Sequence, residues 1–211
     1  MTQIEPGGGD VSSSQRATKG ERTRKAIVEA AIVRFARDGY RRASLTGIAR
    51  DVGLSPSAIY PYFGDKEALF VAAVDEDAAG EIEDGLAGVT GEQILGDWRQ
   101  VMGGLLEALE RHPLARRVLA GLEPEFTVRL IGIPALEELR KALAANIEAL
   151  QIAGDVRSDA DPQAMARGLV TISLSLLMSL VQTGAGTMDL VGEDVSAVLD
   201  TALRPPGGST A

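Results

Sequence analysis

The sequence predicts an all-α protein in two parts, a small N-terminal head and a larger helical bundle. Apolar residues recur at helical spacing in one segment after another along the 211 residues. Glycine or proline separates these segments, as is typical of helix ends. The alternation of apolar and polar residues that marks a half-buried strand persists nowhere, and the sequence shows no internal repeat. We therefore expect helices from the first apolar segment to the last.

The first expected elements are an arm and a helix. Residues 1–18 are rich in Gly and Ser and lack an apolar period, so we expect a disordered arm. Gly39 is expected to end the helix that follows, and Ser44 can cap the next one. This first helix covers about 20–38, with an apolar stripe formed by Ile27, Val28, Ala31, Ile32 and Phe35.

The next stretch shows the pattern of a helix-turn-helix. Gly53 suits a left-handed stop after a first short helix, Ser55 can cap a second helix, and Pro56 fits the first turn of that helix. Pro61 cannot donate to the carbonyl of Ser57, so the second helix should be short or distorted. In this arrangement the second helix enters the DNA major groove; the alternative is an ordinary hairpin within a helical bundle. The first short helix has one apolar face, formed by Leu45, Ile48, Ala49 and Val52.

The rest of the chain is expected to form the helical bundle. The helix at 66–86 links the head to the body and has an acidic side opposite its apolar stripe, and Gly85 and the glycines after it are expected to loosen the chain. The helix at 162–183 is apolar nearly all round and must be buried on several sides. The tail of residues 205–211 is expected to be disordered. Apolar stripes predict the body helices over about 66–86, 92–111, 114–120, 135–153, 162–183 and 193–203.

The composition indicates a folded soluble protein. Hydrophobic residues make up 45% of the chain, which is enough for a real core. The absence of cysteine excludes disulfides, thiolate metal sites and cysteine nucleophiles, and it fits a reducing cytoplasm. The N-terminus lacks a signal-peptide pattern, and the most apolar run, 168–181, is shorter than a membrane span. We expect a cytoplasmic protein without membrane contact.

The charges are distributed unevenly along the chain. Residues 1–70 contain 11 Lys and Arg against 8 Asp and Glu, a net charge of +3, and the remaining residues carry −12, which gives −9 overall. A modestly basic head can hold phosphate groups while an acidic body stays away from them. We therefore expect weak non-specific DNA binding with a marked dependence on salt.

Together these features resemble the TetR family of transcriptional regulators. The match is specific over positions 22–70, and the remaining two-thirds of the chain resembles the family only in layout. The resemblance implies a three-helix helix-turn-helix DNA-binding head at 19–65 and a C-terminal helical ligand-binding and dimerisation bundle at 66–204. The residues that carry it are Phe35, Gly39, Ser44, Leu45, Ile48, Ala49, Gly53, Leu54, Ser55, Ile59, Tyr60, Tyr62, Phe63, Lys66, Glu67 and Leu69.

The resemblance also implies a homodimer that binds a palindromic double-stranded DNA operator. The helices near 162–183 and 193–203 would pair with those of a second subunit in a four-helix interface. The apolar character of the first of these helices supports this, because one small subunit can hardly cover so much apolar surface. The alternative is that it is the central core helix of a monomer.

Mapped onto this sequence, the family's DNA contacts fall in the second and third helices of the head. Ser44 and Thr46 lie at the start of the second helix, while Tyr62, Lys66 and Arg42 would hold phosphate. The recognition segment has short side chains and no Arg or Asn for bidentate base pairing, so readout would combine close contact with DNA shape. The full set of expected contact residues is Arg42, Ser44, Thr46, Ser55, Pro56, Ser57, Tyr60, Tyr62 and Lys66.

The body is expected to hold a small apolar effector. A bound effector would bias the helix at 66–86 and change the distance between the two recognition helices, which must lie one DNA turn apart, roughly 34–36 Å. Ordinary core packing is the alternative for each candidate lining residue. These candidates are Trp98, Met102, Leu105, Phe126 and Met178.

Few residues support an enzyme. The single histidine, His112, precedes a proline at a helix end, which suits a surface or capping role better than a catalytic one. No Gly-rich phosphate loop follows a strand, acidic pairs such as Glu123 and Glu125 are expected to be solvated, and no carboxylate spacing indicates a metal site. We expect neither catalysis nor a cofactor or metal. The competing hypothesis is a helical protein-interaction module whose acidic body docks a partner protein.

Overall fold

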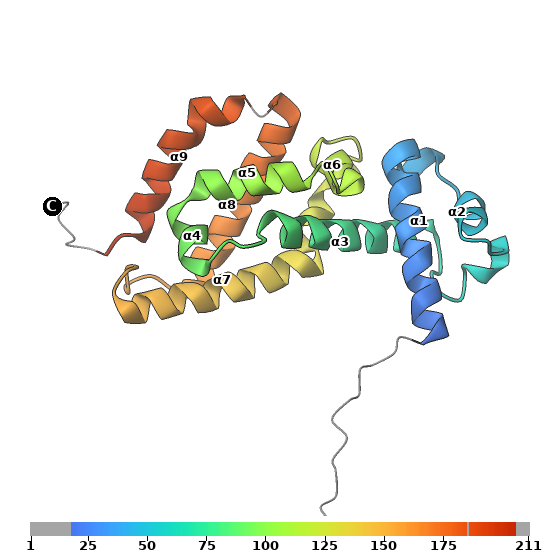
Figure 1. Ribbon diagram of the computed structural model, residues 1–211, viewed down its shortest axis with the longest axis horizontal. Helices are drawn as coiled ribbons and strands as arrows, with labels where there is room; N and C mark the ends of the chain where they lie inside the picture. Colours follow the sequence, from blue (N-terminus) through green and yellow to red (C-terminus); the bar gives the residue numbers. More distant parts are fainter. Residues whose placement is uncertain (1–17, 185, 206–211) are drawn as a thin grey trace, which may run out of the picture.

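The structure is a computed structural model that describes residues 18–184 and 186–205, and this part of the chain is all helical, as predicted (Figure 1). The side chains of residues 91, 92, 129, 130 and 190 are outside the description. So are the expected disordered arm and tail, apart from Thr18 and Pro205. The head contains α1 (Lys19–Arg42), α2 (Leu45–Asp51) and the 3-10 helix η1 (Pro56–Ala58).

The helix α3 (Lys66–Gly85) runs from the head into the body. In Figure 1 the body and α2 lie on opposite sides of α1. The expected helix at 92–111 is interrupted at Asp97, whose backbone leaves the helical region and whose carboxylate accepts a hydrogen bond from the backbone N–H of Gln100 at 3.0 Å. The elements of the body after α3 are α4 (Gly91–Gly96), α5 (Trp98–Ala108), α6 (Pro113–Leu119), η2 (Thr127–Gly132), α7 (Pro134–Ala153), α8 (Pro162–Thr183) and α9 (Thr187–Leu203).

The helix α1 begins and ends with local signals. Thr18 and Glu21 form a capping box at its start. Gly39 breaks the helix with φ of 78°, as predicted, and a short helical turn follows before Ala43. A side chain at this glycine would be strained by the positive φ, and a Cβ would lie 2.6 Å from a guanidinium nitrogen of Arg117, which would have to move. The break therefore lets the end of α1 approach the body closely.

The junction of head and body is an aromatic cluster. Phe35 and Tyr40 from α1 pack against Phe70 of α3, with ring centroids 4.9 Å and 5.0 Å from the Phe70 ring, respectively. Phe126 of the body completes the cluster, 4.3 Å from Phe70 and 4.7 Å from Tyr40. Because Phe70 of α3 lies at the centre of this cluster, a displacement of α3 would also move the residues of α1 that pack against it.

The helix α8 is apolar over its whole length. By length and composition it is the one helix in the described part of the chain that could cross a membrane. The helix extends beyond the apolar run 168–181, so the shortness of that run is not an argument against a membrane span. Only 22% of its most apolar window is buried within the single chain. The helix packs mainly against α7 and also touches α5, α6 and α9, yet apolar side chains such as Ile172 remain exposed.

Candidate DNA-binding surface and effector pocket

The corner of the helix-turn-helix is fixed by backbone hydrogen bonds. Ser44 caps α2 by accepting a hydrogen bond from the N–H of Gly47 at 3.1 Å. Gly53 has φ of 71°, which Cβ-bearing residues rarely adopt, and the N–H of Leu54 donates back to the carbonyl of Ala49 at 2.8 Å. The predicted glycine turn is thereby confirmed.

The second helix of the motif is shorter than that of a regular helix-turn-helix. It consists of the single 3-10 turn η1, followed by turns in which Tyr62 and Phe63 donate to the carbonyl of Ile59 at 2.9 Å and 3.0 Å. Pro61 explains the early end, because proline lacks the N–H that would continue the helix. Ile59 is fully buried and holds the segment to the head, while the side chains before it remain outside.

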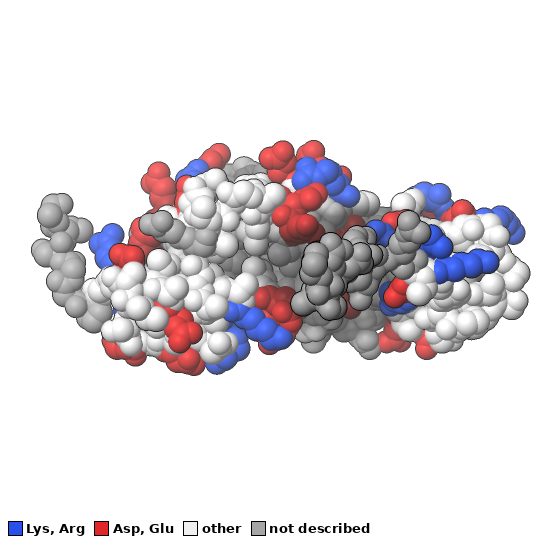
Figure 2. Space-filling view, turned by 60° about the horizontal axis from the view of Figure 1, so that its bottom comes forward, with Lys and Arg blue, Asp and Glu red and all other residues white. Residues whose placement is uncertain are grey.

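Most of the predicted DNA-contact residues are solvent-exposed on the head. Tyr60 is 57% exposed, next to the fully buried Ile59. Tyr62 and Lys66 are half-buried. Figure 2 shows basic side chains over the head and more acidic ones over the body, as the charge distribution predicted. The exposed members of the predicted set are Arg42, Ser44, Thr46, Ser55, Pro56, Ser57 and Tyr60.

Lys66, which is predicted to hold a phosphate, makes several contacts within the folded chain. Its ammonium group donates to the carbonyl oxygens of Tyr40 at 2.8 Å, Ala43 at 3.2 Å and Arg41 at 3.4 Å, and it lies 4.5 Å from the centroid of the Tyr40 ring. An ammonium has three donors, and here all three face the end of α1. The geometry favours a structural role in which Lys66 joins α3 to α1.

Arg34 orients α2, a role that the sequence pattern did not reveal. Its guanidinium holds both carboxylate oxygens of Asp51, with Nε 3.0 Å from Oδ2 and Nη2 2.6 Å from Oδ1. A second carboxylate, that of Asp38, lies 3.7 Å from Nη1. Arg34 and Asp51 are 17 residues apart on different helices, so only the folded arrangement shows the pair. This bidentate contact fixes the angle between α1 and the helix-turn-helix.

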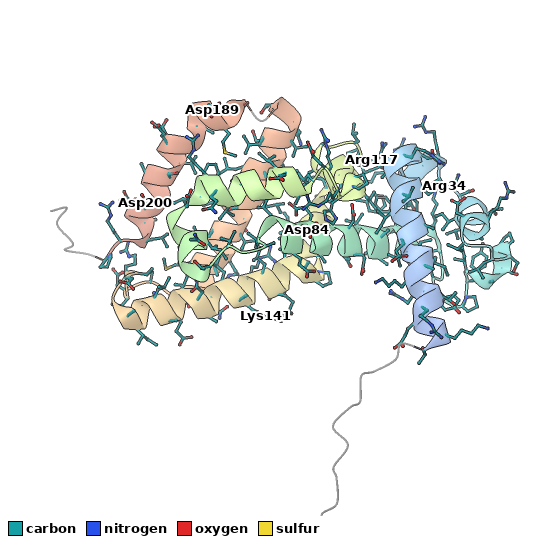
Figure 3. The ribbon with its side chains drawn as sticks, in the orientation of Figure 1. Arg34, Asp84, Arg117, Lys141, Asp189 and Asp200 are labelled. Carbon is teal, nitrogen blue, oxygen red and sulfur yellow. The ribbon has the colours of Figure 1, made fainter. Side chains whose placement is uncertain are left out.

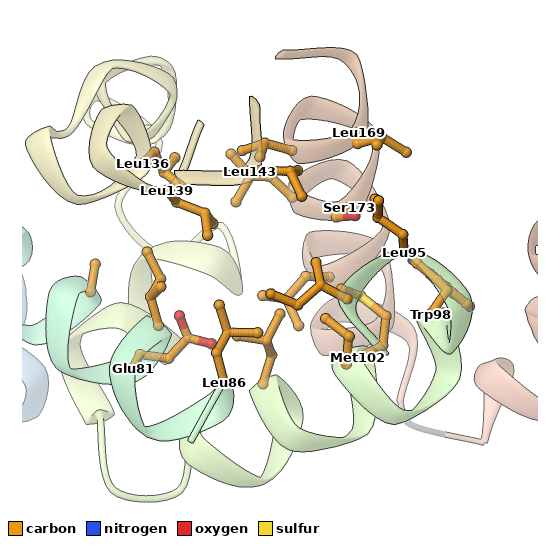
Figure 4. A pocket seen from close by; sticks show the side chains of 18 of the residues that line it. Glu81, Leu86, Leu95, Trp98, Met102, Leu136, Leu139, Leu143, Leu169 and Ser173 are labelled. Atoms are coloured by element: carbon orange, nitrogen blue, oxygen red, sulfur yellow. The ribbon is translucent and has the colours of Figure 1, made fainter. Parts of the chain in front are cut away.

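The body contains a cavity of about 100 Å³ lined mainly by leucine and other apolar side chains of α3, α5, α7 and α8 (Figure 4). Three of the predicted lining residues, Trp98, Met102 and Leu105, do line it. The other two candidates, Phe126 and Met178, are not among the residues that line this cavity. Phe126 belongs to the aromatic junction with the head, and Met178 packs against the core outside the cavity lining.

Glu81 is the unexpected residue of this cavity. It lies on the acidic side of α3, yet only 4% of it is exposed and its side chain lines the cavity. Its Oε1 is buried without a hydrogen-bond partner among the described residues. Burial, and secondarily the nearby charge of Asp77, raise the pKa of Glu81 to about 8. A carboxyl group that keeps its proton near neutral pH is therefore held in an apolar pocket, and no cation of the described residues pairs with it.

Asp77, which raises the Glu81 pKa, is itself fully engaged. Its Oδ2 accepts hydrogen bonds from the N–H groups of Leu114 and Ala115, both at 2.8 Å, and so caps α6 from α3. Its Oδ1 lies 3.2 Å from Nδ1 of His112, whose Nε2 lies 3.3 Å from Asp84. His112 is thus half-buried at the N-terminus of α6, in agreement with the expected capping position.

Glu123 also departs from its expected solvated position. It is buried, accepts a hydrogen bond from Nε of Arg117 at 2.6 Å and another from the N–H of Tyr40 at 3.1 Å. Arg117 in turn reaches the carbonyl of Ala36 at 3.4 Å. Figure 3 shows Arg117 beside the upper end of α1. These contacts fasten α6 to the end of α1, next to the aromatic junction.

Comparison with known proteins agrees with this architecture. Residues 27–73 match the family model of bacterial regulatory proteins, tetR family. The chain is 31% identical to the HTH-type transcriptional repressor AcnR of Corynebacterium efficiens over 87% of this chain and 94% of that protein. It is 32% identical to AcnR of Corynebacterium glutamicum over 84% and 89% of the two chains. A TetR-family regulator from Pectobacterium atrosepticum has the same fold, with a TM-score of 0.65, 22% identity, and coverage of 89% of this chain and 98% of its own.

An N-terminal helix-turn-helix head joined to a helical body is the architecture of the TetR-family regulators that this chain resembles in structure. The relatives add that this chain belongs to the TetR family and is a transcriptional repressor of the helix-turn-helix type, not an enzyme.

Proposed function

We propose that the protein represses transcription as a homodimer that binds a palindromic operator in the cytoplasm and is released by a small apolar effector. The observation that carries DNA binding is the exposed row from Ser55 to Ser57 with Tyr60, held in place by the buried Ile59. The names of the curated relatives support repression.

The contacts with DNA divide into two groups. Ser44 and Thr46 stand at the N-terminus of α2, where free backbone N–H groups favour a phosphate. Ser57 and Tyr60 are exposed on the recognition segment and would approach the bases and the sugar-phosphate backbone. Lys66 acts indirectly, because it holds the end of α1 against α3.

Operator binding is tested with DNA from upstream of the protein's own gene. We expect tight binding that weakens steeply as salt is raised, because phosphate contacts release counterions. Replacing Tyr60 with alanine should weaken binding about tenfold, whereas Ser57→Arg should change the preferred sequence by adding a bidentate donor. Fluorescence anisotropy with a set of operator variants measures both effects.

The matched control for Tyr60→Ala is Ile152→Ala, which removes an exposed apolar side chain from α7, far along the chain from the head. It should leave operator affinity unchanged. Parent-like affinity and sequence preference in both head variants would refute the assigned surface.

Dimerisation through α8 and α9 accounts for their uncovered apolar side chains. Ile172 on α8 is 47% exposed and Val198 on α9 is 67% exposed. Burying this surface against a second copy stabilises the dimer by a free energy of roughly 25 cal/mol per Å² of apolar area removed from water. A paired α8 also explains why an apolar helix of this length lies near the surface of a single chain.

Replacing Ile172 and Val198 together with glutamate should convert the dimer to a monomer, because two like charges per subunit would be buried in the interface. Light scattering after size-exclusion chromatography measures the mass. Ile152→Glu places the same charge at an 84% exposed apolar residue of α7 and should leave the mass unchanged. A parent chain that is monomeric at high concentration would contradict the interface.

The helix α3 supplies the path from the cavity to the DNA-binding head. Its C-terminal half lines the cavity with Ala78, Glu81 and Ile82. Its N-terminal half lies in the head core through Leu69 and Phe70. An effector that binds one position of α3 better than another would shift the separation of the two heads, and operator DNA would oppose effector binding by the same factor.

A further inference from the structure

Two residues that line the cavity each carry a buried polar atom without a partner among the described residues. One atom is Oε1 of Glu81, and the other is Nε1 of Trp98. A buried polar atom that makes no hydrogen bond is costly, and native proteins retain few of them. Figure 4 shows the two side chains on opposite sides of the cavity. Both belong to the same pocket, so a single bound molecule can satisfy both.

From this geometry we propose that the effector is a small lipophilic amine whose protonated nitrogen pairs with Glu81 inside the apolar cavity. This inference rests on the proposed effector-releasable repression for its biological meaning, but the binding itself does not require DNA. The apolar body of the amine would contact leucine side chains such as Leu136 and Leu143. An acceptor atom at its other end would suit the N–H of Trp98.

The charges around Glu81 select a cation over a neutral ligand. No lysine or arginine of the described residues forms an ion pair with Glu81, while the second carboxylate, Asp77, adds to the negative potential at this end of the cavity. Asp77 is occupied by the α6 backbone and His112, so it is not available as the ligand partner. The apolar walls exclude water, which strengthens an ion pair once a cation has entered. Burial raises the pKa of Glu81, as expected for a carboxyl group that lacks such a cation.

The cavity size limits the ligand. A volume of about 100 Å³ is small beside the few hundred Å³ of drug-sized sites, so the pocket as it stands takes a compact molecule. A short alkyl or cycloalkyl amine is the matching chemical class. Longer amines would require α7 or α8 to move away from α3.

The test uses hexylamine and hexanol, which have the same alkyl chain and differ in charge. Trp98 is the only tryptophan of the chain, so its fluorescence reports directly on the cavity. We expect hexylamine to bind at least ten times more tightly than hexanol to the full-length protein without DNA. Glu81→Gln should abolish this preference, because it keeps the shape and removes the carboxyl group that gives up its proton to pair with the ammonium. Glu83→Gln makes the same change two residues away at an exposed position and should retain the preference.

The outcomes separate the inference from the proposed function. Equal affinity for the two probes, tighter binding of hexanol, or no binding of either would overturn the amine proposal, and so would a parent-like preference in Glu81→Gln. A second measurement follows release of operator DNA by anisotropy. Amine binding that depends on Glu81 without operator release would leave the amine site intact and would contradict only the proposed effector response.

Discussion

Replacing Gly104 with alanine is expected to lower the free energy of unfolding by about 3 kcal/mol, because α3 and α5 cross with almost no space between their backbones. A Cβ at Gly104 would lie 2.4 Å from the carbonyl oxygen of Gly85. A Cβ at Gly85 would likewise lie 2.9 Å from Cα of Leu105. Backbone atoms cannot rotate away as a flexible side chain can, so the helices would have to separate.

The neighbouring glycine is the control for this prediction. Gly103 lies in the same helix, and a Cβ there would meet no atom within 4 Å. Gly103→Ala should therefore raise the free energy of unfolding by up to about 1 kcal/mol, which is the helix-propensity gain of alanine. Urea denaturation of both variants measures the contrast. Equal stabilities of the two would show that the crossing is looser than described.

This crossing matters for function because it lies beside the cavity. Leu105 packs against Gly85 and also lines the cavity. Leu86, the residue after Gly85, lines the cavity as well. Forcing the helices apart at Gly104 should therefore change the shape of the pocket as well as the stability of the fold. Gly103→Ala should leave the pocket unchanged while it stabilises the fold, so it suits effector measurements in which a more stable protein is useful.

The glycines show which features of the fold the sequence predicts and which it does not. Gly39 and Gly53 were assigned correctly, because a helix end and a left-handed turn are local events that neighbouring residues reveal. Gly85 was expected to loosen the chain after α3 and instead packs against Gly104. Nothing near Gly85 in the sequence indicates its partner, which lies 19 positions away on another helix.

The same distinction applies to the candidate sites. The apolar faces of α5 and the exposed recognition segment followed from periodicity and turn residues, so Trp98, Met102 and Leu105 could be placed near a cavity in advance. Phe126 could not be placed correctly, because an aromatic residue suits a core and a pocket equally well. Carboxylates were the least predictable, since Glu81 and Glu123 share their pattern with solvated acidic residues and differ only in what the fold packs around them.

Glu81 gives the second large effect, a stability that decreases as pH rises. Burial raises its pKa in the folded protein to about 8, against an ordinary value of 4.5. Below 4.5 both the folded and the unfolded chain carry the proton, so stability is highest there for this group. Between 4.5 and about 8 the folded chain keeps the proton and the unfolded chain loses it, so unfolding becomes easier with every pH unit. At about 1.4 kcal/mol per pH unit, the difference of about 3.5 between the two pKa values corresponds to a loss of roughly 5 kcal/mol.

Glu81→Gln should remove this slope, because an amide does not ionise in that range. The variant and the parent should differ by a nearly constant amount well below pH 4.5, and between pH 4.5 and about 8 the difference should shift steadily in favour of the variant. All other titratable groups are common to both proteins and cancel in the difference. Glu83→Gln, at an exposed position of the same helix, should follow the parent at every pH. Parallel stability profiles of Glu81→Gln and the parent would contradict this prediction, because they would mean that Glu81 has an ordinary pKa in the folded protein. Solvent would then have to reach the Glu81 carboxyl group, or α3 would have to move so that the group is exposed.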